Sequence, residues 1–497
     1  MLNDWLVKRS QFTPDKTALV DAVSGERLNY RELERRVSSL ISYLQQYDLK
    51  KGERVAVIGY NSIFYLTLLY ALPRVGAVLV PLNFRLSPGE LSGILKNASP
   101  SLLFYSSELI GLAESATESI EPLETKEIEE AENHLDKFPP GQAVSGSAQL
   151  DHLEPEDPWM ILYTGGTTGL PKGAILSYRM VTWNAINTVV SWGLNPDDVV
   201  LMPMPFFHTG GLNVLTNPLI YLGGTVVVMQ SFEPEFYLEV LEREKGTIIF
   251  LVPTMFQMLT ETERFEKADF TSVRFCISGG SPCPESLYHR YWQKGLLFKQ
   301  GYGLTEVGPN CFALDDRKVK EKIGSVGRPV FHGRASLVDD QGREVPSGEV
   351  GELIMSGPHV FSGYWNNREA TEKALSNGWF HTGDLARCDG DGFYYIVDRK
   401  KDMFISGGEN VFPVEIENVL YQYPAVAEAA VVGVPHPKWG EVGRAYVSFQ
   451  EGASATEEEL LKHCREHLAK YKVPREVIIK DSLPKSPAGK ILKRSLH

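Results

Sequence analysis

Short, uninterrupted apolar runs recur up to about residue 280, and they constrain the fold more than any other feature of the sequence. Strands that are buried on both faces have this pattern, and helical segments such as Leu66–Leu72 separate the runs. The alternation predicts an α/β fold with parallel sheets. By contrast, the Glu-, Ser- and Pro-rich residues 106–157 are expected to form a loosely packed, solvated connection. The expected strands are residues 54–60, 77–82, 101–105, 159–164, 199–204, 224–230, 248–253 and 273–280.

The pattern changes after about residue 320, where β-rich segments alternate with turn signals such as the two adjacent Asp-Gly pairs at 389–392. The charged cluster at 398–402 contains no apolar residue, and we interpret it as a hinge. We therefore expect a large N-terminal domain (1–397) with parallel or mixed sheets, helices and a β-rich subdomain. The hinge joins it to a small, mobile α+β C-terminal domain (403–497).

The composition of the 497 residues is that of an ordinary globular protein, with 43% hydrophobic and 23% charged residues. A net charge of −13 excludes a chain-wide basic face, so we expect no nucleic-acid partner. The five cysteines form no CxxC pair, which disfavours a zinc site or a disulfide framework and favours a reducing compartment. The first residues lack the apolar stretch of a signal peptide, and Pro73-Arg74 splits the most apolar window, 63–82. We therefore expect a cytoplasmic protein without a membrane span.

A glycine- and threonine-rich segment, Tyr163–Gly173 (YTGGTTGLPKG), directly follows one of the expected strands. Glycines let backbone N–H groups converge on an anion, threonine hydroxyls add donors, and Lys172 adds a positive charge. The segment is not a Walker A loop, because Pro171 precedes the lysine and no Ser or Thr follows it. The segment predicts a phosphate-binding loop that includes Gly165, Gly166, Thr167, Thr168, Gly169 and Lys172.

Three other segments accompany this loop: Gln300–Glu306 (QGYGLTE), His381–Asp384 (HTGD) and Pro484–Lys490 (PKSPAGK). Together and in this order, the four segments resemble the motifs of the adenylate-forming superfamily of acyl-CoA synthetases, non-ribosomal adenylation domains and beetle luciferases. The resemblance covers essentially the whole chain and is greatest to bacterial fatty-acid–CoA ligases. One departure is Gly165, where the family's loop usually has serine.

The resemblance implies how the nucleotide site is built. Tyr302 would stack on adenine, Thr305 would contact the α-phosphate, and Glu306 would hold Mg²⁺ together with Thr164. These oxygen donors suit the ion, because Mg²⁺ takes few protein ligands and completes its octahedron with phosphate and water. The other residues implied for this site, which line the adenine pocket or flank the tyrosine, are Gly279, Gly280, Ser281, Gly301 and Gly303.

Asp384 and Arg399 are the implied ribose ligands, and a carboxylate with two oxygens suits a vicinal diol. Lys490 would be the mobile catalytic lysine, which contacts the substrate carboxylate and the α-phosphate. Lys401 would be the pivot of the hinge. Once the small domain has turned, the loop that faces coenzyme A would contain Gly407 and Gly408.

For the acid, the resemblance points to the segment 205–211 (PFFHTGG), which lines the acyl and pantetheine channel in the family. His208 would contact or gate the substrate carboxylate and take part in catalysis. Leu212 stands at the substrate position where some long-chain synthetases have a tryptophan gate, so such a gate is absent or built elsewhere.

The implied reaction is a two-step ligation. A carboxylate attacks the α-phosphorus of ATP to give an acyl-adenylate and pyrophosphate, and the thiol of coenzyme A then displaces AMP. The first step needs no general base, because a carboxylic acid is already ionised at pH 7. We expect ATP, Mg²⁺, coenzyme A and a fatty acid as the small-molecule partners. The alternatives are an aryl acid of the succinylbenzoate or hydroxycinnamate type, or a carrier protein as acyl acceptor, and a homodimer is left open.

Replacing Lys490 by alanine should lower the rate of acyl-adenylate formation by about 10²–10³-fold, because one preorganised donor to a developing charge is worth that much. Thioester formation from supplied acyl-adenylate should be spared, because rotation of the small domain would carry Lys490 away. Separate assays of the two half-reactions, with the wild type and with the Lys490→Ala variant, measure the rates of adenylate formation and of thioester formation. An equal loss in both half-reactions would contradict the rotation.

Overall fold

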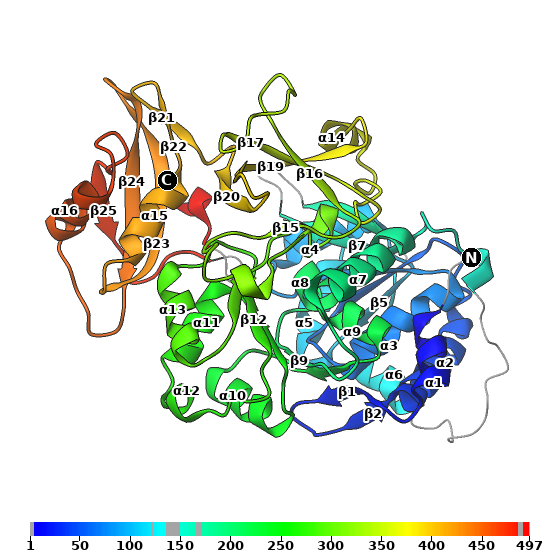
Figure 1. Cartoon of the computed structure of the whole chain (residues 1–497). Helices are drawn as coiled ribbons and strands as arrows, with labels where there is room; N and C mark the ends of the chain where they lie inside the picture. The colour runs from blue at the N-terminus through cyan, green and yellow to red at the C-terminus, as the bar shows by residue number, and fades with distance from the viewer. Residues whose placement is uncertain (1–3, 121–122, 136–149, 166–170, 486–490, 497) are drawn as a thin grey trace.

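Two mostly parallel sheets form the larger part of the chain, and the C-terminal residues form a further sheet beside them (Figure 1). The computed structural model describes residues 4–120, 123–135, 150–165, 171–485 and 491–496. The six-stranded sheet has the order β6 (Glu124–Glu127), β5 (Leu102–Tyr105), β3 (Arg54–Ile58), β4 (Val78–Leu82), β7 (Pro158–Thr164) and β8 (Lys172–Ser177). The seven-stranded sheet has the order β13 (Phe298–Gln300), β12 (Phe275–Ser278), β11 (Ile248–Leu251), β9 (Val199–Met202), β10 (Thr225–Val228), β1 (Thr17–Asp21) and β2 (Arg27–Asn29).

Strand β3 explains why the apolar runs are continuous. Val55 and Val57 pack into the core between the two sheets, whereas Ala56 and Ile58 pack into a second core on the opposite face. Because successive side chains of a strand point to opposite faces, a strand that is covered on both faces needs apolar residues at every position. Each of the expected strands is present, and the predicted α/β class is confirmed.

Helices cover both faces of each sheet. The core between the sheets contains α2 (Tyr30–Leu44), α3 (Ile63–Ala71), α7 (Tyr178–Trp192) and α9 (Thr216–Leu222), with α1 (Trp5–Phe12) packed on α2. The outer face of the six-stranded sheet is covered by α4 (Pro88–Ala98) and α5 (Ile110–Thr117). The outer face of the seven-stranded sheet is covered by α10 (Pro234–Arg243), α11 (Pro253–Thr260) and α13 (Glu285–Gln293).

An antiparallel, β-rich part follows. Its main sheet has the order β16 (Arg334–Val338), β17 (Val350–Ser356), β19 (Trp379–Cys388) and β18 (Leu375–Ser376), with β20 (Tyr394–Arg399) paired to β19. Helix α14 (Arg368–Ala374) precedes β18, and a two-stranded sheet pairs β14 (Phe312–Ala313) with β15 (Arg328–Pro329).

The C-terminal sheet has a core of its own with two helices. The chain passes from one sheet to the other between Arg399 and Phe404, within the residues predicted as a hinge. The movement of this hinge, and hence the division at 398–402, stays a prediction. The elements of this part are β21 (Phe404–Ser406), β22 (Glu409–Val411), α15 (Pro413–Tyr421), β23 (Val426–His436), β24 (Gly440–Phe449), α16 (Glu457–His467) and β25 (Glu476–Ile479).

The expectation of a loose connection at 106–157 is wrong for most of the described residues of that segment. Helix α5, strand β6 and helix α6 (Ile128–Leu135) lie there. Small or apolar residues such as Ala113, Ala116 and Ala131 are buried, and β6 pairs with β5 in parallel. The glutamates that suggested a solvated loop occupy an edge strand and exposed helix faces, where polar side chains are tolerated.

The most apolar window, 63–82, divides as expected into helix α3 and strand β4. Gly76 connects them in the left-handed conformation, with φ at 76°. Across the described part of the chain, every helix is too short or too polar to reach from one side of a membrane to the other.

His359 follows β17 and is buried with neither ring nitrogen hydrogen-bonded to any described residue. A Cβ added to Gly357 would lie 2.6 Å from the ring, so the chain fits closely around it. Burial, together with the nearby positive groups of Arg179 and His332, lowers the pKa of His359 to about 4. The imidazole is therefore neutral in the folded protein at pH values where it would be charged in the unfolded chain.

Replacing His359 by leucine should make the protein more tolerant of acid. The unfolded chain binds the proton near the ordinary pKa of 6.5 and the folded chain only near 4, so wild-type stability falls as the pH drops through this window. At pH 5 this difference in proton binding lowers the free energy of unfolding of the wild type by about 2 kcal/mol. Between pH 7 and pH 5 the melting temperature should drop more in the wild type than in the variant. An equal drop in both proteins would contradict a neutral, buried His359.

Candidate active site

Most of the predicted site residues in the described part of the chain line one cleft of about 1730 Å³. The cleft lies at the carboxyl ends of the parallel strands: Thr164 ends β7, Gly279 follows β12 and Gly301 follows β13. Ligands of open α/β sheets bind at this end of the strands. Together the cleft contains Thr164, Gly165, His208, Gly279, Gly280, Ser281, Gly301, Tyr302, Gly303, Thr305, Glu306, Asp384, Arg399 and Lys401.

Asp384 joins two other predicted nucleotide ligands. The hydroxyl of Tyr302 donates to Asp384 Oδ2 at 2.6 Å, and Arg399 Nε lies 3.4 Å from Oδ1. Asp384 and Arg399 are also register partners in strands β19 and β20, which fixes their separation. Burial raises the pKa of Tyr302 well above its ordinary value, so the phenol keeps its proton and donates. A carboxylate has two oxygens that can accept hydrogen bonds from the two hydroxyls of a diol, so the arrangement fits the predicted ribose contact.

Glu306 is positioned by a residue that the sequence analysis missed. The hydroxyl of Tyr364 donates to Glu306 Oε1 at 2.8 Å, and the ammonium of Lys172 lies 5.3 Å from the centre of the same ring. A backbone bridge pairs Tyr364 with Ala174 of β8. Tyr364 therefore connects the strand that follows the phosphate loop with the segment that carries Glu306. Tyr364 and Glu306 are 58 residues apart in sequence, and no local motif predicts their contact.

Strands β7 and β8, on either side of the predicted phosphate loop, are antiparallel neighbours. Thr164 at the end of β7 pairs with Lys172 at the start of β8. Strand β8 is not among the strands expected from the sequence. The predicted phosphate contacts of Gly166, Thr167, Thr168 and Gly169, and the role of Lys490, fall outside the described residues.

The two predicted metal ligands fit a divalent cation. Both offer oxygen, the donor that Mg²⁺ prefers. Burial raises the pKa of Glu306, against the opposing effect of the Tyr364 hydrogen bond. A buried carboxylate that is costly to ionise is stabilised by a cation beside it. Thr164 ends a strand at the same cleft, with its hydroxyl 3.4 Å from the carbonyl oxygen of Lys172.

His208 is the N-cap of the short helix α8 (Thr209–Asn213). Its Nδ1 accepts a hydrogen bond from the backbone N–H of Gly210 at 3.1 Å, so the proton of the neutral ring is on Nε2. Gly211 has no room for a side chain, because an added Cβ would lie 2.3 Å from the carbonyl oxygen of Pro205. His208 lines the cleft, and its hydrogen bond to the backbone of Gly210 orients the ring.

Some predicted residues are not brought to the cleft. Among the described residues that line the cleft, Lys172 is absent, but its ammonium lies over the ring of Tyr364, which is one of them. Leu212 is fully buried in the core between the sheets. Gly407 and Gly408 form the turn between β21 and β22, where the N–H of Gly407 donates to the carbonyl oxygen of Trp439 at 2.8 Å. Their predicted roles toward the acyl group and coenzyme A stay predictions.

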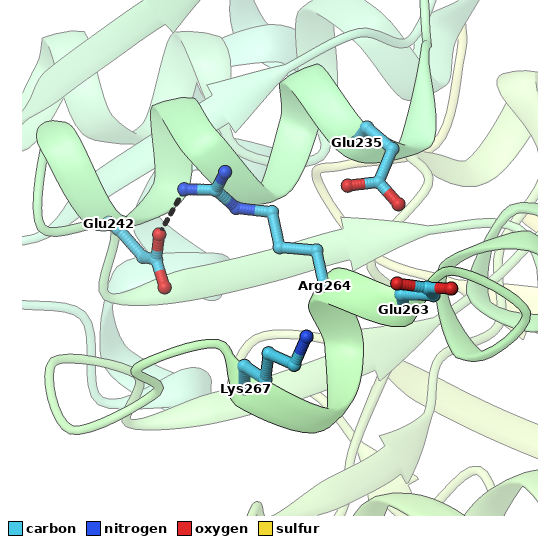
Figure 2. Close-up of a pocket in the computed structure, with 5 residues that line it drawn as sticks. All are labelled: Glu235, Glu242, Glu263, Arg264 and Lys267. Carbon is cyan, nitrogen blue, oxygen red and sulfur yellow. Dashed lines mark hydrogen bonds and ion pairs between the residues drawn. The ribbon is translucent and has the colours of Figure 1, made fainter.

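A second, smaller depression lies between α10 and α12 (Glu263–Lys267) and has only charged lining residues (Figure 2). Arg264 forms an ion pair with Glu242 across it, and Lys267, Glu235 and Glu263 complete its rim. It contains none of the motif residues and has the mixed charge of an ordinary protein surface. We assign no function to it.

The comparisons with known proteins agree with the motifs. Residues 6–365 match the AMP-binding enzyme family, and residues 415–490 match the AMP-binding enzyme C-terminal domain. Feruloyl-CoA synthase of Amycolatopsis is 42% identical, covering 99% of this chain and 97% of that protein. Indoleacetate–CoA ligase of Aromatoleum aromaticum is 35% identical, covering 99% and 96%.

A solved structure of o-succinylbenzoate CoA synthetase from Bacillus subtilis, in complex with its acyl-adenylate intermediate, is similar over 100% of this chain and 98% of that one. The TM-score is 0.88 and the identity 32%. A second structure of that enzyme, in complex with ATP and a magnesium ion, has a TM-score of 0.87, 31% identity and 99% coverage of both chains. With both family regions matched and relatives above 30% identity over nearly the full length, the chain belongs to the AMP-binding, adenylate-forming enzyme family.

Proposed function

We propose that the protein is an AMP-forming ligase that joins an aromatic carboxylic acid to coenzyme A at the expense of ATP. The observation that carries the proposal is the nearly full-length similarity to CoA ligases whose acids each contain an aromatic ring: ferulate, indoleacetate and o-succinylbenzoate. The fatty acid expected from the sequence has less support, because these three relatives are named for aromatic acids.

In the first step, the ionised acid attacks the α-phosphorus of ATP. Asp384 and Arg399 hold the ribose, Tyr302 lies against the base, and Thr305 contacts the phosphate that is attacked. Glu306 and Thr164 hold Mg²⁺, which when bound neutralises phosphate charge. Positioning and charge neutralisation supply the catalysis, since the nucleophile needs no deprotonation.

In the second step, the thiol sulfur attacks the acyl carbonyl carbon, the bond to the phosphate oxygen breaks, and AMP leaves with the bonding electrons. We propose that rotation about Lys401 exchanges Lys490 for the 407–408 loop between the steps. His208 lines the cleft, and its proposed role is to contact the carboxylate of the acid in the first step.

A panel of acids tests the proposed function. CoA-dependent formation of AMP should be highest with ferulate, 4-hydroxycinnamate, indoleacetate or succinylbenzoate. It should be at least about 10-fold lower with saturated acids from C2 to C18, because a flexible chain pays more ordering entropy on binding than a rigid aromatic acid. An assay without coenzyme A gives the background. A preference for a saturated acid would contradict the aromatic assignment, and the absence of AMP with every acid would contradict the ligase.

Tyr364→Phe should raise the Mg²⁺ concentration for half-maximal rate about 10-fold, because the carboxylate of Glu306 loses a charge-assisted hydrogen bond. Equilibrium binding of Mn²⁺ in the presence of AMP should weaken by the same factor. Tyr395→Phe is the matched control, since that hydroxyl donates to Asp389 at 3.2 Å, away from the cleft. Equal metal dependence in the two variants would contradict the positioning role of Tyr364.

A further inference from the structure

Asn310 has an amide oxygen that is unpaired among the residues that the structure describes. The residue is 1% exposed, lines the cleft, and immediately follows Pro309 in the segment that closes back on Tyr302. The N–H of Cys311 donates to the carbonyl oxygen of Tyr302 at 3.1 Å, which holds this segment beside the predicted adenylate site. Among the described residues, nothing donates to Asn310 Oδ1.

The orientation of this amide is fixed by its nitrogen. Asn310 Nδ2 donates to Thr188 Oγ1 at 2.7 Å and to the carbonyl oxygen of Val214 at 2.8 Å. Thr188 uses its own proton to donate to the carbonyl oxygen of Asn184 at 2.7 Å, so toward Asn310 it acts only as an acceptor. Flipping the amide would set its oxygen against two acceptors. The unpaired atom is therefore an acceptor.

We propose that Asn310 Oδ1 is a specificity determinant that accepts a hydrogen bond from the ring of the substrate, so that the enzyme prefers aromatic acids with a ring donor such as a phenolic O–H or an indole N–H. The inference rests on the proposed function and narrows its substrate class. A buried acceptor left unpaired is costly, and a ligand donor removes that cost. A site built around such a bond discriminates strongly against analogues that lack the donor, and an alkyl chain would leave the oxygen unpaired.

Asn184 provides an internal comparison. Its Nδ2 donates to the carbonyl oxygen of Asn213 at 2.7 Å, and its Oδ1 also has no partner among the described residues. A Cβ on Gly308 would lie 2.7 Å from this oxygen, so the backbone of Gly308 lies directly against it. Unlike Asn310, it does not belong to the described residues that line the cleft. The two amides differ in access to the cleft rather than in hydrogen bonding.

Three acids of similar shape separate the hypotheses: 4-hydroxycinnamate has a donor, cinnamate has none, and 4-methoxycinnamate has an acceptor only. In the wild type, kcat/KM for AMP formation should be about 10- to 100-fold higher for 4-hydroxycinnamate than for either analogue. Asn310→Leu should bring these ratios close to one, mainly by slowing the hydroxylated acid. Asn184→Leu should leave the ratios as in the wild type.

Equal kcat/KM of the wild type for the three acids would overturn the proposal. A ratio of kcat/KM between 4-hydroxycinnamate and its analogues that is unchanged in Asn310→Leu would also overturn it. The wild-type comparison needs no variant, so it holds even if Asn310→Leu does not fold, and the smaller Asn310→Ser then replaces it. Rapid turnover of all three acids would refute the role of Asn310 and leave the ligase intact. Failure of every aromatic acid would refute the proposed function itself.

Discussion

Helices on both faces of the two central sheets direct the polar chemistry of this protein to the carboxyl ends of the strands. The sheet faces are occupied by apolar side chains in three packed layers, so residues that must meet a charged ligand gather where the strands end. Strands β7, β12 and β13 come from different sheets or different positions in one sheet, yet Thr164, Gly279 and Gly301 reach one cleft. Asp384 comes to the same cleft from β19 of the antiparallel sheet, and it is therefore 82 residues away in sequence from Tyr302, to which it is hydrogen-bonded.

The features that could be predicted from the sequence are those encoded within a few consecutive residues. An apolar run identifies a strand that is covered on both faces, and β3 shows the physical reason in the alternation of its side chains between two cores. The motif residues around Tyr302 and Asp384 could likewise be selected because each short segment is distinctive by itself. That they converge on one cleft is a property of the fold, which the motifs imply only through resemblance.

The features that could not be predicted depend on pairings between distant segments. Tyr364 has no distinctive neighbours, and its importance arises because a bridge to Ala174 brings its hydroxyl to Glu306. The significance of Asn310 lies in a single oxygen, and it is visible only once the proton of Thr188 is known to be used elsewhere. The polar segment before residue 136 has the composition of a loop although it contains β6, because an edge strand needs little apolar sequence when its neighbour β5 supplies the pairing.

Strand β20 places the predicted ribose contact and the predicted hinge next to each other. Arg399 faces Asp384 across the register, while the preceding carboxylate, Asp398, accepts the N–H of Val414 in the first turn of α15 at 3.0 Å. Burial raises the pKa of Asp398 to about 6, and the ammonium of Lys493 opposes this shift, so the group is ionised at pH 7. A rotation about Lys401 would break the bond between Asp398 and Val414, which is worth about 1.5–3 kcal/mol for a charged acceptor. The pairing of Asp384 with Arg399 lies wholly before the pivot, so the nucleotide can stay bound through the rotation while the small domain exchanges its contacts.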